Sequence, residues 1–459
     1  MLLSVESAVE SADGPRDHLD GLPDELLLQI FEMLGRMSKR DLCNVSRLNM
    51  RYHRLSDAVL YKSILFETPD LHLTFSESLG RRPRRGSAIF EVKLAYPSAA
   101  LEQLALDAPL RHHYDPSHSL SRMSNLEKLD ISLPDKLLHG IGCLFNGPFD
   151  LACLKTCSLF YQCADDGYWD LRENIHIFAH PELESLTIRR AKLDDRGFDS
   201  LERPHETALK KLHLIECDIN DDTLSDVLEF PIGLEEFVMT QLEDPEPDLE
   251  ESSDSFSDYI IALGSQTHSL KSITIDFPTL GCRKTLRMRE FEALKELRMN
   301  WDYQLFGKSS KKPRLHSVGL PPALEVLEFF NELGKDEEVT DLLLAMLQNK
   351  SVVARTLKRM IVVEGNDKVL REVKSICKEQ GLPLDIIGEL DDSGDEMPSP
   401  VITSPPPWRV TIIAECLLAA HTHAKQAHTS TLGSRTFNQR LRNTRLRRRY
   451  RPRNWRNTS

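Results

Sequence analysis

The sequence predicts an α/β chain, in which a small N-terminal helical unit precedes a solenoid whose curved parallel sheet carries helices on its outer face. Three observations support this prediction: an apolar stripe with helical period near the start, a six-residue apolar pattern that recurs through the body, and a basic end that follows a proline-rich stretch. At 459 residues the chain is also too long for one ordinary core. We expect domains at 18–66 and 67–388, with disordered segments at 1–17 and 389–459.

The helical unit begins at a clear start signal. Leu22-Pro23-Asp24-Glu25 indicates the first turn of a helix, because proline in the first turn loses no N–H that the helix needs. The two acids also lie where the helix dipole favours negative charge. The apolar positions that follow have three- and four-residue spacing, which is typical of one helix face, and they are Leu27, Ile30, Phe31 and Leu34.

Two further helices are expected in this unit. Gly35 is suited to end the first helix, and Ser38 can cap the second. The apolar positions of the second helix are Leu42, Val45 and Leu48, and a third helix is expected from Met50 to Leu60. A unit of this size buries little surface by itself, so it depends on a neighbour or a partner for stability.

This ordered set of residues resembles the F-box over roughly 45 positions. The resemblance rests on the run from Leu22 to Phe31, on Leu34, Leu42, Val45, Ser46 and Arg47, and on His53-Arg54-Leu55 followed by Val59 to Ile64. Leu48 to Tyr52 departs from it, because it lacks the Trp- or Cys-rich run of some members. An alternative is a plain helical hairpin that caps the next domain.

The resemblance implies a partner and a set of contact residues. F-boxes bind the Skp-type adaptor and, through it, a cullin–RING ligase of the SCF class. The residues that the resemblance assigns to this interface, or to the helical frame that holds it, are Leu22, Pro23, Leu27, Ile30, Phe31, Leu34, Leu42 and Val45.

The body repeats one pattern, apolar-x-x-apolar-x-apolar, at intervals of 24 to 37 residues. The last three positions of each copy predict a short strand, and stacked copies bury their apolar edges against one another. The ten copies are Ile89-Val92-Leu94, Leu126-Leu129-Ile131, Leu154-Cys157-Leu159, Leu183-Leu186-Ile188, Leu209-Leu212-Leu214, Leu234-Phe237-Met239, Leu270-Ile273-Ile275, Leu294-Leu297-Met299, Leu324-Leu327-Phe329 and Leu357-Met360-Val362.

The fullest copy runs from Leu209 to Ile219 and is followed by a helical return, which Asp221 or Asp222 can cap. Leu224, Val227 and Leu228 are expected to face inward. This copy resembles the cysteine-containing leucine-rich repeat that often accompanies an F-box. An irregular α/β domain whose strands share a motif by chance is the alternative.

Charge is distributed unevenly along the chain. Residues 401–459 contain 12 Lys/Arg and one acid, a net charge of +11, whereas the remainder has 46 basic and 70 acidic residues. An acidic body disfavours wrapping around nucleic acid. The segment 243–258 is expected to be a disordered acidic loop and 389–407 a linker; Ser252, Ser253, Ser255 and Ser393 are candidate phosphorylation sites in these two segments. The Arg-rich run at 440–456 is either a polyanion-binding or nuclear-import segment, or a flexible tail without selected function.

The sequence shows no motif that identifies an enzyme. Cys143, Cys153, Cys157 and Cys163 lack the CxxC spacing of zinc sites, and Cys157 falls on an expected strand. The histidines at 112, 113 and 118, and those at 421, 423 and 428, lack helical register and carboxylate partners. Neither a P-loop nor a nucleophile elbow is present. We therefore expect a non-catalytic protein with no catalytic residues, cofactor or metal.

The expected cellular location and role of the chain follow from these observations. The first 21 residues lack the pattern of a secretory signal, no stretch is apolar enough to span a bilayer, and the cysteines form no disulfide framework. The chain is therefore expected in the cytoplasm, the nucleus or both, without a membrane. Its expected role is that of a substrate-recognition adaptor of a ubiquitin ligase, with an unknown target protein. The alternatives are a cullin-independent Skp-binding scaffold and a nucleic-acid-associated repeat protein that uses the Arg-rich tail.

Overall fold

The computed structural model describes residues 19, 21–97, 116–135, 144, 151–163, 167–194, 206–242, 255–277, 280, 286–300, 320–332, 337–365 and 367–387. The predicted segments 1–17 and 389–459 lie outside these residues. Within the part of the chain that the structure describes, no helix is both long and apolar enough to cross a bilayer.

Three helices form the N-terminal unit, as predicted: α1 (Asp24–Met37), α2 (Lys39–Val45) and α3 (Met50–Leu60). The oxygen of the Ser38 side chain accepts a hydrogen bond from the Asp41 N–H and caps α2, which confirms the predicted cap. The prediction that Gly35 ends the first helix is wrong. Helix α1 continues to Met37, and a Cβ atom at Gly35 would lie 3.0 Å from Val59 and 3.1 Å from Leu42. Gly35 therefore serves close helix packing.

The rest of the described chain is built on one parallel sheet of twelve strands, ordered β1-β2-β3-β4-β6-β8-β10-β11-β12-β13-β14-β15. Each strand pairs with the next in parallel register, which confirms the predicted α/β class. The strands are β1 (Ser63–Phe66), β2 (Glu91–Ala95), β3 (Lys128–Pro134), β4 (Thr156–Gln162), β6 (Ser185–Arg189), β8 (Lys211–Ile215), β10 (Glu236–Thr240), β11 (Ser272–Asp276), β12 (Glu296–Met299), β13 (Val326–Glu332), β14 (Arg359–Val363) and β15 (Leu384–Ile387).

The last two apolar positions of every copy lie on one of these strands, and the first position precedes the strand. All thirty apolar positions of the ten copies are buried, and none is more than 3% exposed. The two strand positions of each copy point to the same face of the sheet because alternate residues of a strand share a face. The two edge strands β1 and β15 were not predicted, since neither carries a leucine three residues before its first inward position.

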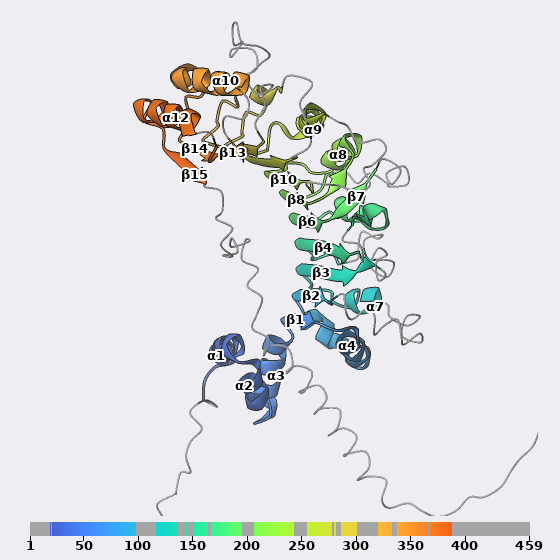
Figure 1. The fold of residues 1–459 in the computed structure, drawn as a ribbon. Coiled ribbons are helices and arrows are strands. Elements are labelled where there is room, and N and C mark those ends of the chain that lie inside the picture. Colours follow the sequence, from blue (N-terminus) through green and yellow to red (C-terminus); the bar gives the residue numbers. More distant parts are fainter. Residues whose placement is uncertain are drawn as a thin grey trace, which may run out of the picture. The chain divides into compact units, whose positions relative to one another are not determined.

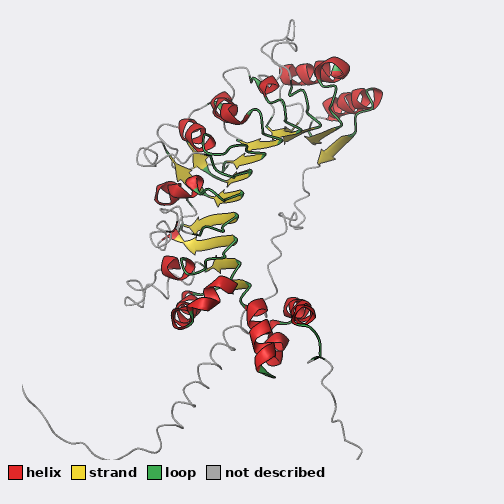
Figure 2. Cartoon of the chain, turned by 180° about the vertical axis from the view of Figure 1, so that it is seen from behind, coloured by secondary structure: helices red, strands yellow, loops and turns green. Residues whose placement is uncertain are grey.

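The helices of the body lie along one side of the sheet (Figures 1 and 2). They are α4 (Pro69–Arg81), α7 (Pro116–Leu120), α8 (Asp221–Leu228), α9 (Phe256–Ala262), α10 (Glu337–Gln348), α11 (Lys350–Val353) and α12 (Asp367–Glu379), together with 3-10 helices at Pro83–Ala88, Leu171–Ala179, Leu263–Gln266 and Met288–Glu290. A second, three-stranded parallel sheet consists of β5 (Trp169–Asp170), β7 (Ala191–Leu193) and β9 (Asp218–Ile219).

Helix α8 follows the fullest repeat, and its inward residues Leu224, Val227 and Leu228 are buried as predicted. Its cap differs from the prediction. The oxygen of Asn220, not of Asp221 or Asp222, accepts hydrogen bonds from the N–H groups of residues 222 and 223. Asp221 is already the first helical residue, where its charge favours the helix dipole instead.

The acidic loop ends earlier than its predicted boundary at residue 258. Ser255 directly precedes α9, and the hydroxyls of the buried residues Ser255 and Ser257 lie 2.7 Å apart. Residues 243–254, with Ser252 and Ser253, lie outside the described part of the chain, as does Ser393. Burial removes Ser255 from the candidate phosphorylation sites.

Candidate partner-binding surfaces

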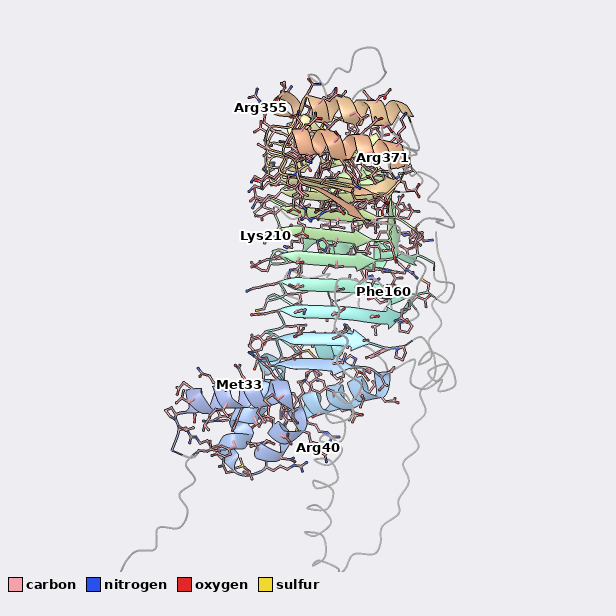
Figure 3. All side chains as sticks on the ribbon, turned by 60° about the vertical axis from the view of Figure 1, so that its left-hand side comes forward. Met33, Arg40, Phe160, Lys210, Arg355 and Arg371 are labelled. Carbon is pink, nitrogen blue, oxygen red and sulfur yellow. The ribbon has the colours of Figure 1, made fainter. Side chains whose placement is uncertain are left out.

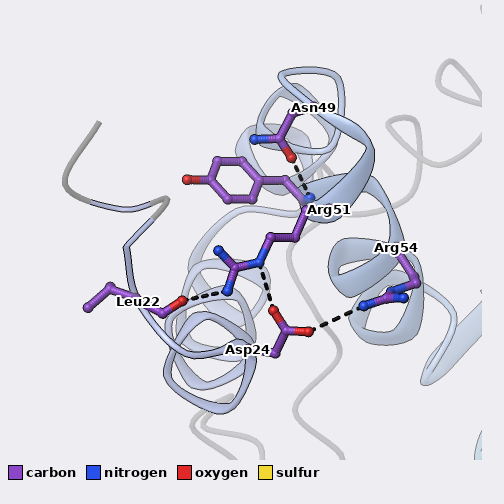
Figure 4. A network of polar contacts seen from close by, with 6 residues as sticks. Leu22, Asp24, Asn49, Arg51 and Arg54 are labelled. Carbon is purple, nitrogen blue, oxygen red and sulfur yellow. Dashed lines mark hydrogen bonds and ion pairs between the residues drawn. The ribbon is translucent and has the colours of Figure 1, made fainter. Parts of the chain in front are cut away.

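The start of α1 is fixed by a polar network that joins it to α3 (Figure 4). Arg51 is its centre: the Nε atom lies 2.7 Å from Asp24 Oδ1, and the same guanidinium donates to the backbone carbonyl of Leu22. Arg54 reaches the other oxygen of Asp24 at 3.3 Å. The hydrogen bond from Arg51 lowers the pKa of Asp24 and so favours the charged carboxylate.

The eight residues that the F-box resemblance assigned to the interface or to its helical frame separate into two groups. Leu27, Phe31 and Leu42 are buried and form the core of the helical unit with Tyr52, whose ring meets Phe31 edge to face at 5.5 Å. Those three residues belong to the frame. The other five are Leu22, Ile30, Leu34 and Val45, which are partly buried against this core, and Pro23, which is exposed.

A second apolar stripe on α1 was missed. Leu26, Met33 and Met37 are 45%, 57% and 76% exposed, and with Ile30 they have the spacing of one helix face. Figure 3 labels Met33 on this helix. Leu48, which was predicted on the second helix but follows the end of α2, is 69% exposed, and Met50, the first residue of α3, is 82% exposed. The 4-3-4 spacing of positions 26, 30, 33 and 37 was the signal in the sequence that could have found the stripe.

The sheet presents a different surface on the face that points away from its core. Residues there alternate with the buried ones and are mostly polar, and charged side chains pair across neighbouring strands. The pairs Lys128–Glu91, Lys93–Asp130 and Lys211–Glu236 have N–O distances of 2.8, 2.7 and 2.7 Å. Further pairs along the sheet are Arg298–Glu328 and Arg359–Asp385. This surface is polar, broad and built from consecutive strands.

The cysteines and histidines of the described residues form no cluster that could hold a metal ion. Cys157 lies in the core as predicted, and burial raises its pKa well above the usual value. Cys217 is buried as well, and burial raises its pKa to about 12, so neither thiol ionises readily. His118 is exposed, whereas Cys143 and the histidines at 112, 113, 421, 423 and 428 lie outside the described residues.

Comparison with known families gives one result for this chain. Residues 19–67 match the family model described as F-box-like. The matched segment contains α1, α2, α3 and β1, and therefore the polar network and the exposed apolar stripe. No curated protein matches the chain.

Proposed function

Because this chain carries an F-box-like domain at residues 19–67, we propose that it is a substrate-recognition adaptor of an SCF-type ubiquitin ligase. The helical unit docks a Skp-type adaptor, and the face of the parallel sheet holds a target protein. The observation that carries the proposal is the family match to a unit that displays large apolar side chains on α1.

The exposed stripe supports docking of a partner along α1. Large apolar residues that follow one helix face at the surface are unusual for a monomer and typical of helix-mediated binding. Burying a side chain such as Met33 or Met37 yields about 1.5–3 kcal/mol. The Arg51–Asp24 contact supports the same assignment, since it fixes the first turn of the helix that carries the stripe.

The sheet supports the second half of the proposal. Twelve parallel strands present their outward side chains as one polar surface that no described helix covers (Figure 2). Such a surface suits recognition of another protein. Catalysis in this proposal is proximity: the receptor raises the concentration of its target beside a charged conjugating enzyme, while other subunits perform the chemistry.

Binding of a purified Skp-type adaptor to the intact chain tests the docking step. We expect the double substitution Met33→Glu/Met37→Glu to weaken binding more than a hundredfold, because two apolar contacts are lost and two charges are buried. Glutamate is a good helix former, so α1 keeps its fold. The matched control is Ile261→Glu on α9, an apolar residue that is 63% exposed outside the helical unit.

The outcomes separate the proposal from its rivals. Equal binding by the double variant and by the control contradicts docking along α1. Absence of binding by the folded, unsubstituted chain contradicts the adaptor function as a whole. Binding of the adaptor without co-purification of a cullin would favour a cullin-independent scaffold.

A further inference from the structure

Among the described strand residues, one arginine on the outward face of the sheet differs from the other cations there. Arg189, the last residue of β6, is placed directly beside Phe160 of β4 by the strand register. Its guanidinium carbon lies 5.4 Å from the centre of the Phe160 ring. Figure 3 labels Phe160 toward the carboxyl end of its strand. The ring therefore supports the guanidinium through a cation–π contact and limits its orientations.

The remaining strand cations on this face, within the described residues, each meet an acid. Lys93 pairs with Asp130, Lys128 with Glu91, and Lys211 with Glu236. Further along the sheet, Arg298 meets Glu296 and Glu328, and Arg359 meets Asp385. Arg189 makes the ring contact and no ion pair with a described residue. Its five N–H donors are thus available to an outside acceptor.

The surroundings of Arg189 are uncharged over two strands. Thr156 and Ser158 of β4 register with Ser185 and Thr187 of β6, so four hydroxyl residues precede the ring and the guanidinium on the same face of these two strands. Ile215 of β8 stands next to Arg189 in register. We define Phe160, Arg189, Ile215 and these four hydroxyl residues as the Arg189 patch. It combines one cation, two apolar side chains and several small hydrogen-bonding groups.

The charges at the borders of the Arg189 patch decide which anion suits it. Asp130 of β3 lies on one side and already pairs with Lys93, and Glu236 of β10 lies on the other and already pairs with Lys211. Arg190, the next residue, already donates its Nε–H to Glu216 at 2.7 Å. A phosphate, with nearly two charges, would meet a single guanidinium, because the lysines at the borders already pair with Asp130 and Glu236. A carboxylate needs one planar guanidinium, which it can bind with two parallel hydrogen bonds.

We propose that the Arg189 patch binds an Asp or Glu side chain flanked by an apolar residue in an acidic segment of the target protein. The carboxylate accepts two hydrogen bonds from Arg189, and the apolar neighbour packs on Phe160 and Ile215. This inference rests on the proposed function, because it names the chemistry of the target held by the sheet. The site deepens that proposal without involving the helical unit.

The test uses the full chain bound to a Skp-type adaptor and an array of immobilised short peptides. Each peptide carries an Asp-Leu, Glu-Leu, Asp-Phe or Glu-Phe pair, and matched peptides replace the acid by Asn or Gln, or by phosphoserine. We expect binding to the carboxylate peptides, and we expect Arg189→Gln to weaken it ten- to a hundredfold, the range for a lost charge-assisted hydrogen bond. Arg189→Lys keeps the charge but loses the planar pair of donors, so its affinity for the carboxylate peptides falls between that of the unsubstituted chain and that of Arg189→Gln.

The control variant is Arg355→Gln, which removes one positive charge from the turn that precedes β14 and leaves the sheet face unchanged (Figure 3). It is expected to bind the carboxylate peptides like the unsubstituted chain. Equal affinity for acid and amide peptides, unchanged binding by Arg189→Gln, or no peptide binding at all would overturn the inference. Preference for phosphoserine peptides would replace the carboxylate by a phosphate and overturn it too. Adaptor binding is measured on the same preparations, so failure of docking at α1 is seen separately.

Discussion

The helical unit and the parallel sheet bury their apolar side chains in different ways. The unit has a core of four buried side chains, Leu27, Phe31, Leu42 and Tyr52, and it leaves methionines such as Met33 and Met37 mostly exposed. The sheet buries every apolar position of its ten pattern copies and displays paired charges outside. A three-helix unit has little interior of its own, so part of its apolar surface remains for a partner. A stacked array gains interior with each repeat, so its outer surface is free for polar recognition.

The largest expected effect comes from the core of the small unit. Phe31→Ala removes a buried ring that meets Tyr52 edge to face, and should cost about 3–5 kcal/mol. We expect the helical unit to unfold and adaptor binding to be lost, while the sheet remains folded. Hydrogen exchange of backbone amides in α1 and in β8 measures both. Simultaneous loss of protection in β8 would break the comparison, because it would mean that the two regions share one cooperative core.

Substitutions on the two faces of the sheet are expected to differ in their cost to stability. Leu212 and Ile215 lie on the same strand, β8, but Leu212 is fully buried and Ile215 points to the outer face. Leu212→Ala should destabilise the sheet by about 2–5 kcal/mol, and Ile215→Ala by less than about 1 kcal/mol. Urea denaturation followed by far-UV circular dichroism gives both values. Similar costs at the two positions would show that the outer face is covered.

How much the sequence could predict also differs between the two regions. The buried strand positions, such as Leu186 and Ile188, could be predicted because side chains alternate along a strand and the apolar pattern repeats through the body. In α1 the sequence contains two adjacent stripes, one with Leu27 and Phe31 and one with Met33 and Met37. Both have helical spacing, and only packing against α3 decides which one is buried. The sequence therefore predicted the helix but not the face that it exposes.

Local polar details were the least predictable. Three consecutive residues, Asn220, Asp221 and Asp222, are all suited to cap α8. Asn220 is the cap because β9 ends at Ile219 and the helix begins at Asp221. Gly35 was predicted to end the helix because glycine is common just after helix C-termini. In the structure, the absence of a Cβ at Gly35 lets the side chains of Val59 and Leu42 pack close to α1. Such choices depend on contacts with residues distant in sequence, which one sequence does not reveal.

A buried histidine near the N-terminal end of the sheet is expected to make the stability of this core depend on pH. His72 on α4 lies between the Tyr96 hydroxyl at 2.9 Å and the Ser119 hydroxyl at 2.6 Å, and its ring stacks on Phe66. Burial lowers the pKa of His72 from 6.5 to about 4. The unfolded chain therefore binds a proton at a pH where the folded chain does not. The contribution of His72 to stability is present above about pH 6.5 and is lost as the pH decreases toward 4, by about 3 kcal/mol in all.

Urea denaturation at neutral pH and near pH 5 measures this loss, for the unsubstituted chain and for His72→Gln. Glutamine keeps polar atoms near Tyr96 and Ser119 but does not titrate. We expect the acid-dependent loss to be smaller in the variant by about 2 kcal/mol at pH 5. An identical pH dependence of the two chains would assign the acid loss to other groups and contradict the burial of a neutral imidazole.

The smallest expected effects come from two buried tyrosines of the same core. Tyr96 and Tyr161 are both almost fully buried, but the Tyr96 hydroxyl contacts His72, whereas the Tyr161 hydroxyl has no hydrogen-bond partner among the described residues. Tyr96→Phe removes the hydrogen bond with the buried imidazole of His72 and should cost about 1–3 kcal/mol. Tyr161→Phe removes a hydroxyl that is already unpaired, so it should change stability by less than about 1 kcal/mol, or raise it. The difference in urea midpoint between the two variants measures the hydrogen bond of Tyr96 with side-chain volume held constant. A larger cost at Tyr161 would mean that a bound water satisfies its hydroxyl, and it would place a second polar site in this core beside the one formed by His72, Tyr96 and Ser119.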